Sequence, residues 1–268
     1  FFLRELHAIT VKDLSPNKEG ALHPGHFRVG NVSISKSTHI PPDFTQVEPL
    51  IDELLEFINR DDPAKYDLLK IAIAHHRFVW IHPFENGNGR VVRLFTYALL
   101  LKKSIFMRNE RIINPTAVFC SNRNEYYYHL AQADSGTDEG LIAWSEYMLR
   151  GLKNEIEKID KLLDYEYLCS TILQPALKDA LERAYITEPE YTILKVAFDK
   201  KEFQASDIKD VLGKNSSDIS RMLRGLKERG MIIPIYETAR RYSPAFSNGL
   251  LLRSILKMLD ANNFLPSN

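Results

Sequence analysis

The sequence predicts a mainly α-helical fold, with a larger helical core and a smaller domain toward the C-terminus. Apolar residues recur at three- and four-residue spacing through most of the 268-residue chain, which is typical of amphipathic helices. One early stretch, residues 25–42, alternates instead and predicts a β-hairpin. The chain is longer than a typical single domain and its pattern changes near Thr187, so we expect a second domain there.

The first elements are an amphipathic N-terminal segment, the hairpin and a helix. The N-terminal residues FFLRELHAIT lack the features of a signal peptide. Pro41 and Pro42 end the hairpin stretch, and the segment DFTQVEPLIDELLEFIN then predicts a helix with Asp43 or Thr45 as its cap. The apolar face of this helix consists of Val47, Leu50, Ile51, Leu54, Leu55 and Ile58.

The next helix is expected in the middle of the core. Residues 63–80 carry apolar side chains around most of the helix circumference, as in a helix that is buried on several sides. Short joints that contain Gly, Asn or Pro separate the helical patterns that follow. These helices are expected at about residues 88–103, 122–134, 138–163 and 166–184.

The C-terminal part predicts a winged helix-turn-helix, because three helical patterns are followed by two short strand patterns. The second helix would span residues 205–212, and Gly213 would make the turn. Ser216 or Ser217 would cap the third helix, which runs to Arg229.

The wing of this domain would follow Gly230 and turn near Thr238 and Ala239. Residues 200–241 hold ten Lys or Arg and six Asp or Glu, a mild excess that permits binding to duplex DNA. Docking to a protein, including dimerisation, is equally compatible with this pattern. The candidate DNA contacts, in the third helix and the wing, are Arg221, Arg224, Arg240 and Arg241.

Composition excludes several other classes of protein. The 35 Lys and Arg balance the 35 Asp and Glu, so no whole-chain field favours nucleic acid or an anionic membrane. Cys120 and Cys169 lack metal-type spacing and suit a reducing compartment, and we expect both in the core. No apolar run reaches the roughly 18 residues of a membrane span. We therefore expect a soluble, cytoplasmic protein without a membrane partner.

The residues that carry chemistry lie at 81–93, IHPFENGNGRVVR, between two predicted helices. A Gly-Asn-Gly turn that opens a helix exposes backbone N–H groups at the positive end of the helix dipole, and so can hold phosphate. Arg90 and Arg93 lie three residues apart, so both guanidinium groups can face one polyphosphate. His82 can take a proton from an incoming hydroxyl. Phe84 would point inward and anchor the loop.

The segment from His82 to Arg90, followed by Arg93, resembles the Fic-family signature HPFx[DE]GNGRxxR. The similarity extends over about residues 3–150, through Leu6-His7, GHFR, AHHRFVWIHPF and the tyrosine run. It implies a helical core in which the hairpin is a flap that registers a target segment by strand pairing. The resulting boundaries are 1–165 for the Fic domain, 166–186 for a connecting helix, 187–248 for the winged helix-turn-helix and 249–268 for a C-terminal helix or tail.

The resemblance also implies a protein adenylyltransferase, which transfers AMP from ATP to a Tyr, Ser or Thr hydroxyl of a target protein. His82 would deprotonate the hydroxyl, which would attack the α-phosphate of ATP and release pyrophosphate. Arg90 and Arg93 would hold the β- and γ-phosphates. The anion hole would consist of Gly87, Asn88 and Gly89, and the nucleotide pocket would include Tyr127 and Asp134.

One position departs from the family pattern, because Asn86 stands where an acidic residue usually holds Mg²⁺. The resemblance implies Mg²⁺ as cofactor and Asn86 as its ligand, but an amide oxygen binds this cation more weakly than a carboxylate. Two other functions therefore stay open: a Fic enzyme that transfers another phosphate-containing group, and a nucleotide-responsive regulator that binds DNA. His75 and His76 are adjacent on a helix and cannot face one metal together, so we expect structural roles for them.

The resemblance also raises the question of an inhibitory element. The family often carries an inhibitory helix with the pattern [ST]xxxE[GN], and two formal matches occur, at residues 15–20 and 135–140. Both look like loops and neither lies where the family places the helix, so we interpret them as chance. The chain begins with Phe1, which leaves open an upstream inhibitory segment.

Overall fold

The computed structural model describes two compact units, unit 1 (Phe1–Ile159) and unit 2 (Asp160–Asn268), each with its own hydrophobic core. Both are mainly helical, as predicted. Within the described part of the chain, no helix combines the length and the apolar character that crossing a bilayer requires. The described residues are all except 17, 35–36, 104–118, 120–121, 238 and 266–268. Cys120 therefore lies outside them, whereas Cys169 is buried in the core of unit 2.

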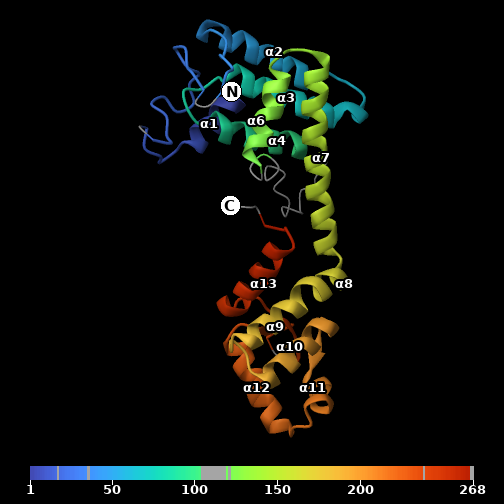
Figure 1. Cartoon of the computed structure of the whole chain (residues 1–268). Coiled ribbons are helices and arrows are strands. Elements are labelled where there is room, and N and C mark those ends of the chain that lie inside the picture. The colour runs from blue at the N-terminus through green and yellow to red at the C-terminus, as the bar shows by residue number, and fades with distance from the viewer. Residues whose placement is uncertain (17, 35–36, 104–118, 120–121, 238, 266–268) are drawn as a thin grey trace. The chain divides into compact units, whose positions relative to one another are not determined.

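Unit 1 is organised around α3, which lies between α2 and α4 (Figure 1). The side chains of Phe78 and Ile81 in α3 are fully buried, as the apolar pattern around that helix predicts. Trp144 in α7 donates its ring N–H to the carbonyl of Ala72 in α3 at 2.7 Å, which joins the two helices. Unit 1 contains α1 (Phe2–Thr10), α2 (Val47–Asn59), α3 (Asp67–Ile81), α4 (Asn88–Lys102), α6 (Arg123–Ala133) and all but the last four residues of α7 (Asp138–Leu163).

The starts of α2 and α3 differ slightly from expectation. A 3-10 turn, Phe44–Gln46, precedes α2, and the Asp43 side chain caps this turn by accepting from the Thr45 N–H at 3.0 Å. A second 3-10 turn, Ala64–Tyr66, precedes α3, so the α-helix itself begins at Asp67 rather than at residue 63. Short 3-10 turns are common at helix N-termini because they tighten the first turn.

The prediction of a hairpin at residues 25–42 is wrong, because none of the residues described there lies in a strand. The backbone of this segment forms a hydrogen bond with the loop after α3, in which the Arg28 N–H donates to the carbonyl of Pro83 at 2.9 Å. The Arg28 side chain fixes the same segment to the end of α3. The loop after α3 thus takes up the backbone N–H of Arg28, which is then not available for a strand ladder. An isolated two-stranded hairpin also has little stability of its own.

Unit 2 combines helices with a small antiparallel sheet of order β1-β3-β2. Phe203 pairs with Tyr242, and Ile233 pairs with Ser243. The helix expected at 166–184 is present as α8 (Tyr165–Leu168), a π-helical stretch (Cys169–Leu173) and α9 (Gln174–Glu182). The remaining elements are α10 (Glu188–Lys200), β1 (Phe203–Gln204), α11 (Ala205–Leu212), α12 (Ser216–Glu228), β2 (Ile232–Pro234), β3 (Arg241–Pro244) and α13 (Gly249–Ala261).

The turn between α11 and α12 follows the prediction except at its cap. Gly213 has φ +62°, a left-handed conformation that glycine adopts without steric cost. The cap of α12 is Asn215, whose side chain accepts from the Asp218 N–H at 2.9 Å, and not Ser216 or Ser217. The predicted wing turn includes Thr238, which lies outside the described residues.

Candidate active site

The HPFENGNGR loop connects α3 to α4 and turns twice through the left-handed region. His82 ends α3 with φ 51°, a conformation that costs a non-glycine residue about 1–2 kcal/mol. Gly87 is the N-cap of α4 and has φ +78°, and a Cβ there would lie 3.0 Å from Cγ1 of Val11 in the chain after α1. The first turn is therefore strained, and the second fits glycine.

Two contacts hold the loop between these turns. Phe84 is fully buried, as predicted, and its ring stacks on that of His7 at 3.9 Å. The Asn88 side chain accepts from the Phe84 N–H at 3.0 Å and donates to the Phe84 carbonyl at 2.8 Å. The amide of Asn88 thus closes the loop.

His7 also fixes the loop from α1. Its Nδ1 accepts from the Gly25 N–H at 2.9 Å, and its Nε2 donates to the Asn86 carbonyl at 3.2 Å. These partners require a neutral ring with its proton on Nε2. Burial lowers the pKa of His7, which agrees with that state.

A cavity of about 320 Å³ adjoins the loop. This volume is at the lower end of the range for small-molecule pockets. The predicted site residues that line it are His82, Asn88, Gly89, Arg93, Tyr127 and Asp134. The opposite walls come from the segment before α2 and from α3 and α6, namely Ile34, Ser37, Thr38, His39, Val79, Tyr126, Leu130 and Ala131.

His82 is uncharged at neutral pH in this setting. Burial lowers the pKa of its imidazole to about 4, the nearby Val79 carbonyl opposes this shift, and the charges of Arg28 and His39 add to it. Nδ1 of His82 is buried and has no hydrogen-bond partner of normal geometry among the described residues. A neutral imidazole that borders a cavity can accept a proton.

The two arginines of the motif do not face the same side. Arg93 lines the cavity, close to Gly89. The Arg90 guanidinium instead donates to the carbonyl of Glu19, in the loop after α1. The first backbone N–H groups of α4 have no intrahelical acceptor. The N-terminal end of α4 and the guanidinium of Arg93 therefore form a positively charged wall of the cavity.

Asn86 does not fit the expected role of metal ligand. Its Oδ1 accepts from the Gly87 N–H at 2.7 Å, and its Nδ2 donates to the carbonyls of Lys18 and Gly20 at 3.1 and 2.9 Å. Asn86 does not line the cavity. Among the residues with described positions, no group of three or more His, Cys, Asp or Glu is placed to hold a metal ion. The amide of Asn86 therefore serves to join two loops.

The two histidines of α3 make internal contacts, which agrees with the structural roles expected for them. His75 is fully buried between the Thr96 hydroxyl at 2.8 Å and the Tyr126 hydroxyl at 3.0 Å, and burial lowers its pKa to about 3. His76 contacts the carboxylate of Asp134 at 2.9 Å. Tyr127 borders the cavity with more than half of its surface exposed.

Sequence reasoning missed three residues around the motif: His7, Arg28 and His39. Nε2 of His39 lies 2.8 Å from the Trp80 carbonyl, and the ring lines the cavity. Arg28 and His39 lie in a segment without regular structure, so periodicity gives no signal for them. The GHFR and Leu6-His7 matches were the only pointers in the sequence.

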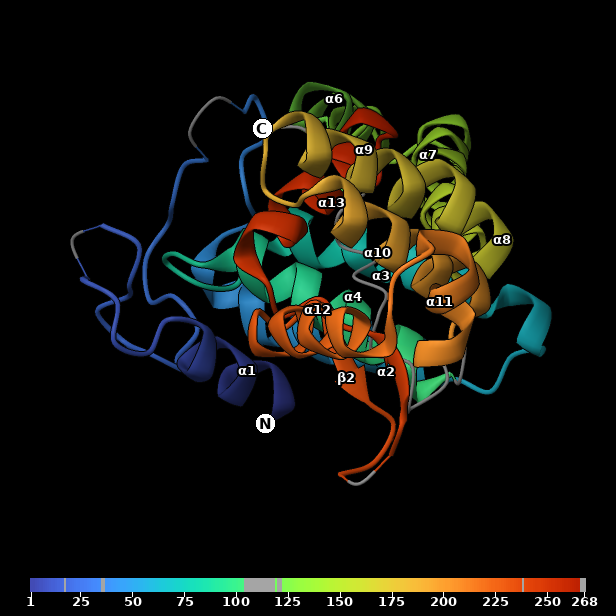
Figure 2. The same cartoon turned by 90° about the horizontal axis from the view of Figure 1, so that it is seen from below.

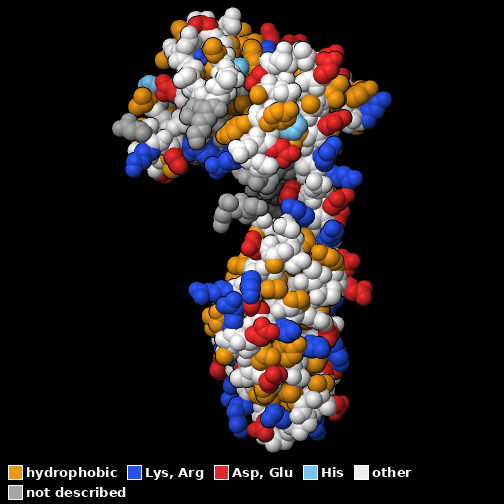
Figure 3. Space-filling view, in the orientation of Figure 1, with side chains coloured by type: hydrophobic (Ala, Val, Ile, Leu, Met, Phe, Trp, Pro, Cys, Tyr) orange, Lys and Arg blue, Asp and Glu red, His pale blue; other side chains and the backbone are white. Residues whose placement is uncertain are grey.

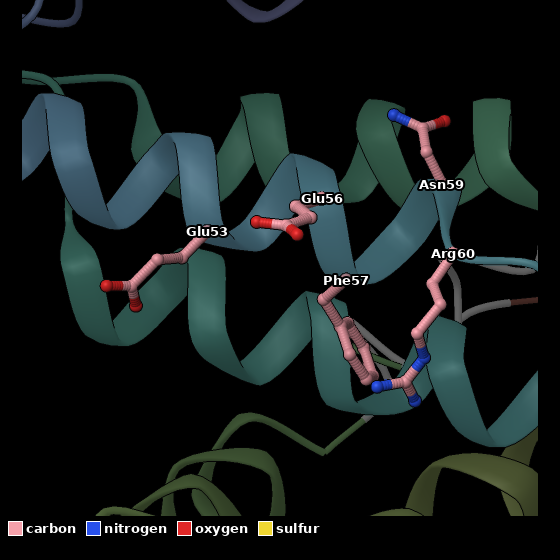
Figure 4. Close-up of a pocket in the computed structure, with 5 residues that line it drawn as sticks. All are labelled: Glu53, Glu56, Phe57, Asn59 and Arg60. Atoms are coloured by element: carbon pink, nitrogen blue, oxygen red, sulfur yellow. The ribbon is translucent and has the colours of Figure 1, made fainter.

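A second hollow, of about 460 Å³, lies at the end of α2 (Figure 4). The Arg60 guanidinium lies beside the ring of Phe57, 5.6 Å from its centroid, and Glu53 and Glu56 project from the same helix. This hollow is lined mainly by exposed side chains and contains no residue of the motif.

Curated proteins with sequences similar to this chain are named protein adenylyltransferases. The chain is 26% identical over 180 residues to the protein adenylyltransferase Fic of Nematostella vectensis, and this match covers 65% of this chain and 37% of that protein. It is 27% identical over 140 residues to the protein adenylyltransferase fic-1 of Caenorhabditis briggsae, and this match covers 50% of this chain and 26% of that protein. The chain thus spans well under half the length of these curated relatives.

A crystal structure of a Fic family protein from Desulfovibrio desulfuricans G20 matches 92% of this chain and 68% of that chain, with TM-score 0.49 and 23% identity. The model of the Fic/DOC family matches residues 2–100, a range that includes the whole His82 to Arg93 motif. The Fic/DOC family is therefore the family that residues 2–100 of this chain match.

Proposed function

We propose that the chain is a protein adenylyltransferase, which transfers AMP from ATP to a Tyr, Ser or Thr hydroxyl of a target protein. The observation that carries this proposal is that His82, the N-terminus of α4 and Arg93 line one cavity. Curated relatives bear the name protein adenylyltransferase, which supports the same reaction.

In the proposed reaction, the proton of the target hydroxyl passes to the His82 imidazole as the oxygen forms a bond to the α-phosphorus. The bond from the α-phosphorus to the oxygen that bridges the α- and β-phosphates breaks, and its electron pair leaves with pyrophosphate. The N-terminus of α4 and Arg93 would stabilise the negative charge. Mg²⁺ accompanies ATP in many such reactions, but we assign no step to it because Asn86 does not fit as its ligand.

The test is incubation of the chain with cell lysate and ATP labelled at either the α- or the γ-phosphate, followed by intact mass measurement of the modified proteins. Label from the α position, with the mass of an added AMP, is expected. Lysate without the chain is the control. Label that arrives only from the γ position would replace the proposal with transfer of another phosphate-containing group. Absence of transfer from either position would contradict both.

We also propose that residues 187–248 form a winged helix-turn-helix that binds duplex DNA. Two observations favour it. Arg221 and Arg224 are exposed one turn apart on α12, with Ser217, Ser220 and Lys227 on the same face. β2 packs beside α12 (Figure 2), and β3, which pairs with β2, begins at the exposed Arg241. Helix and hairpin together offer basic side chains to one groove and its flanking phosphates.

The charge of this surface is modest. Arg221 pairs with Asp218 at 3.5 Å, and Arg241 approaches Glu202 at 4.0 Å. On the face of unit 2 that Figure 3 shows, basic and acidic side chains are interspersed rather than gathered. Binding should therefore be weak and strongly dependent on salt.

The DNA proposal predicts that replacing both Arg221 and Arg224 by alanine in the full chain reduces the slope of log affinity against log salt by about two. The measurement is fluorescence anisotropy with labelled duplex DNA from low to moderate salt. A matched control is the Lys178→Ala, Lys195→Ala double variant, which removes two exposed cations from α9 and α10. Equal slopes in the two variants would instead assign unit 2 to protein docking or dimerisation.

A further inference from the structure

Among the described residues, Arg28 is a buried cation without a salt-bridge partner, and the carboxylate of Asp43 acts on it only through its charge. Its surface is 3% exposed, and none of the described Asp or Glu side chains lies within salt-bridge distance of it. Its partners are mainly backbone carbonyls. Burying a guanidinium costs free energy unless its donors are satisfied, so the arrangement around Arg28 requires a reason.

The partners of Arg28 are concentrated at the bend that carries His82. Nε donates to the His82 carbonyl at 2.9 Å, and Nη2 lies 3.4 Å from the Ile81 carbonyl. The backbone N–H of Arg28 donates to the Pro83 carbonyl at 2.9 Å. A single residue thus holds three successive carbonyls.

The remaining donors tie this bend to the segment before α2. Nη2 also donates to the Pro42 carbonyl at 2.5 Å, and Nη1 donates to the Gly30 carbonyl at 3.1 Å. The last carbonyls of a helix have no intrahelical donor and lie at the negative end of its dipole. The guanidinium therefore meets the end of α3 with suitable charge and geometry.

The bend needs such support because it is strained. His82 has a left-handed backbone at φ 51°, and such conformations persist only where surrounding contacts fix them. The side chain of His82 supplies little support, since its Nδ1 has no hydrogen-bond partner of normal geometry in the described residues. The direction of the imidazole thus depends on the backbone that Arg28 holds.

We propose that Arg28 is a positioning residue for His82, which fixes the bend after α3 so that the imidazole faces the cavity. This inference rests on the proposed transferase function for its kinetic consequence, but its structural part does not. A positioning role differs from a role in stability alone, because it predicts a loss of rate that stability does not explain.

The test compares Arg28→Lys and Arg28→Met with Lys70→Met in the full chain. Lys70 is the control, because it is a buried cation of unit 1 that lies outside the motif and also donates to a backbone carbonyl, that of Arg60 at 2.6 Å. Unlike Arg28, it also pairs with a carboxylate, that of Asp62 at 2.9 Å. Both Arg28 variants should lower kcat by about tenfold, since small misplacement of a reacting group is costly. Lys70→Met should reduce the melting temperature and leave kcat unchanged.

A second readout does not need activity: NMR titration of the ¹⁵N-labelled His82 ring. In the unaltered chain the ring should stay neutral down to about pH 4. Arg28→Met removes a positive charge and admits water, so the pKa should rise, whereas Lys70→Met should not change it. Arg28→Lys keeps the charge and should alter the ring's chemical shifts more than its pKa. The other charged groups around the cavity, His39, Arg93 and Asp134, are the same in all variants.

Two results would overturn the inference. One is a kcat and a set of His82 ring chemical shifts in Arg28→Lys that equal those of the unaltered chain. This result overturns the inference even if Arg28→Met does not fold. The other is an equal loss of kcat in Lys70→Met. If no variant and not even the unaltered chain transfers AMP, the transferase proposal fails, and the His82 titration alone decides whether Arg28 positions the ring.

Discussion

Replacing His82 by alanine is expected to lower the rate of AMP transfer about 10³-fold and to leave ATP binding largely intact. A positioned general base contributes about 10²- to 10⁴-fold. The imidazole of His82, whose pKa burial lowers to about 4, borders the cavity that the N-terminus of α4 also lines. Single-turnover transfer of α-label measures the rate, and calorimetry measures ATP binding. His23→Ala is the matched control, because that histidine is exposed and does not line the cavity.

The pH profile separates this role from a structural one. Because the pKa of His82 is about 4, the fraction of neutral ring rises with pH through that value and is almost complete at neutrality. The kcat/KM of the unaltered chain should therefore be flat near pH 7 and fall below about pH 5. The residual rate of His82→Ala should lose this acid limb. A variant that keeps a third or more of the rate would show that His82 is not the base.

Replacing Arg93 by methionine is expected to lower kcat/KM for ATP about 10²-fold, far more than the same change at Arg90. A hydrogen bond to a charged group contributes about 1.5–3 kcal/mol, and the guanidinium of Arg93 lines the cavity. Arg90 instead donates to the Glu19 carbonyl, so Arg90→Met should chiefly lower the melting temperature. Steady-state kinetics with varied ATP, together with thermal melts, measure both effects.

Two other results for the Arg90 and Arg93 variants would change the roles assigned to these side chains. Equal losses of kcat/KM would mean that Arg90 leaves Glu19 and turns toward the triphosphate when ATP binds. A loss for Arg90→Met alone would contradict the geometry of the cavity wall. The paired design keeps charge, length and helix position nearly constant between the two variants, so the difference reports where each guanidinium points.

The helices were predictable because their information is local. The spacing of apolar residues in α2 and the apolar surround of α3 follow from the period of a helix, and the structure has both close to the expected bounds. The motif was predictable for the same reason, since His82, Gly87 and Arg93 lie within a single turn and the helix that follows it.

The contacts that shape the site were not predictable in this way, because each joins residues far apart in the sequence. Arg28 meets the His82 carbonyl across 54 positions, and His7 meets the Asn86 carbonyl across 79. Asn86 looked like a weakened metal ligand because its partners at residues 18–20 have no pattern. The alternating stretch before α2 looked like a hairpin because alternation reports two unlike faces, not the presence of a neighbouring strand.

The stacking of His7 on Phe84 has a practical consequence for anyone who wishes to shorten the protein. A fragment trimmed to begin at α2 would keep the complete HPFENGNGR segment, yet it would lack the ring that covers Phe84 and the donor that holds the Asn86 carbonyl. Phe84 would then meet water, and the turn at Gly87 would lose its neighbour Val11. The smallest piece worth expressing for work on this motif therefore includes α1, although about seventy residues separate it from the motif.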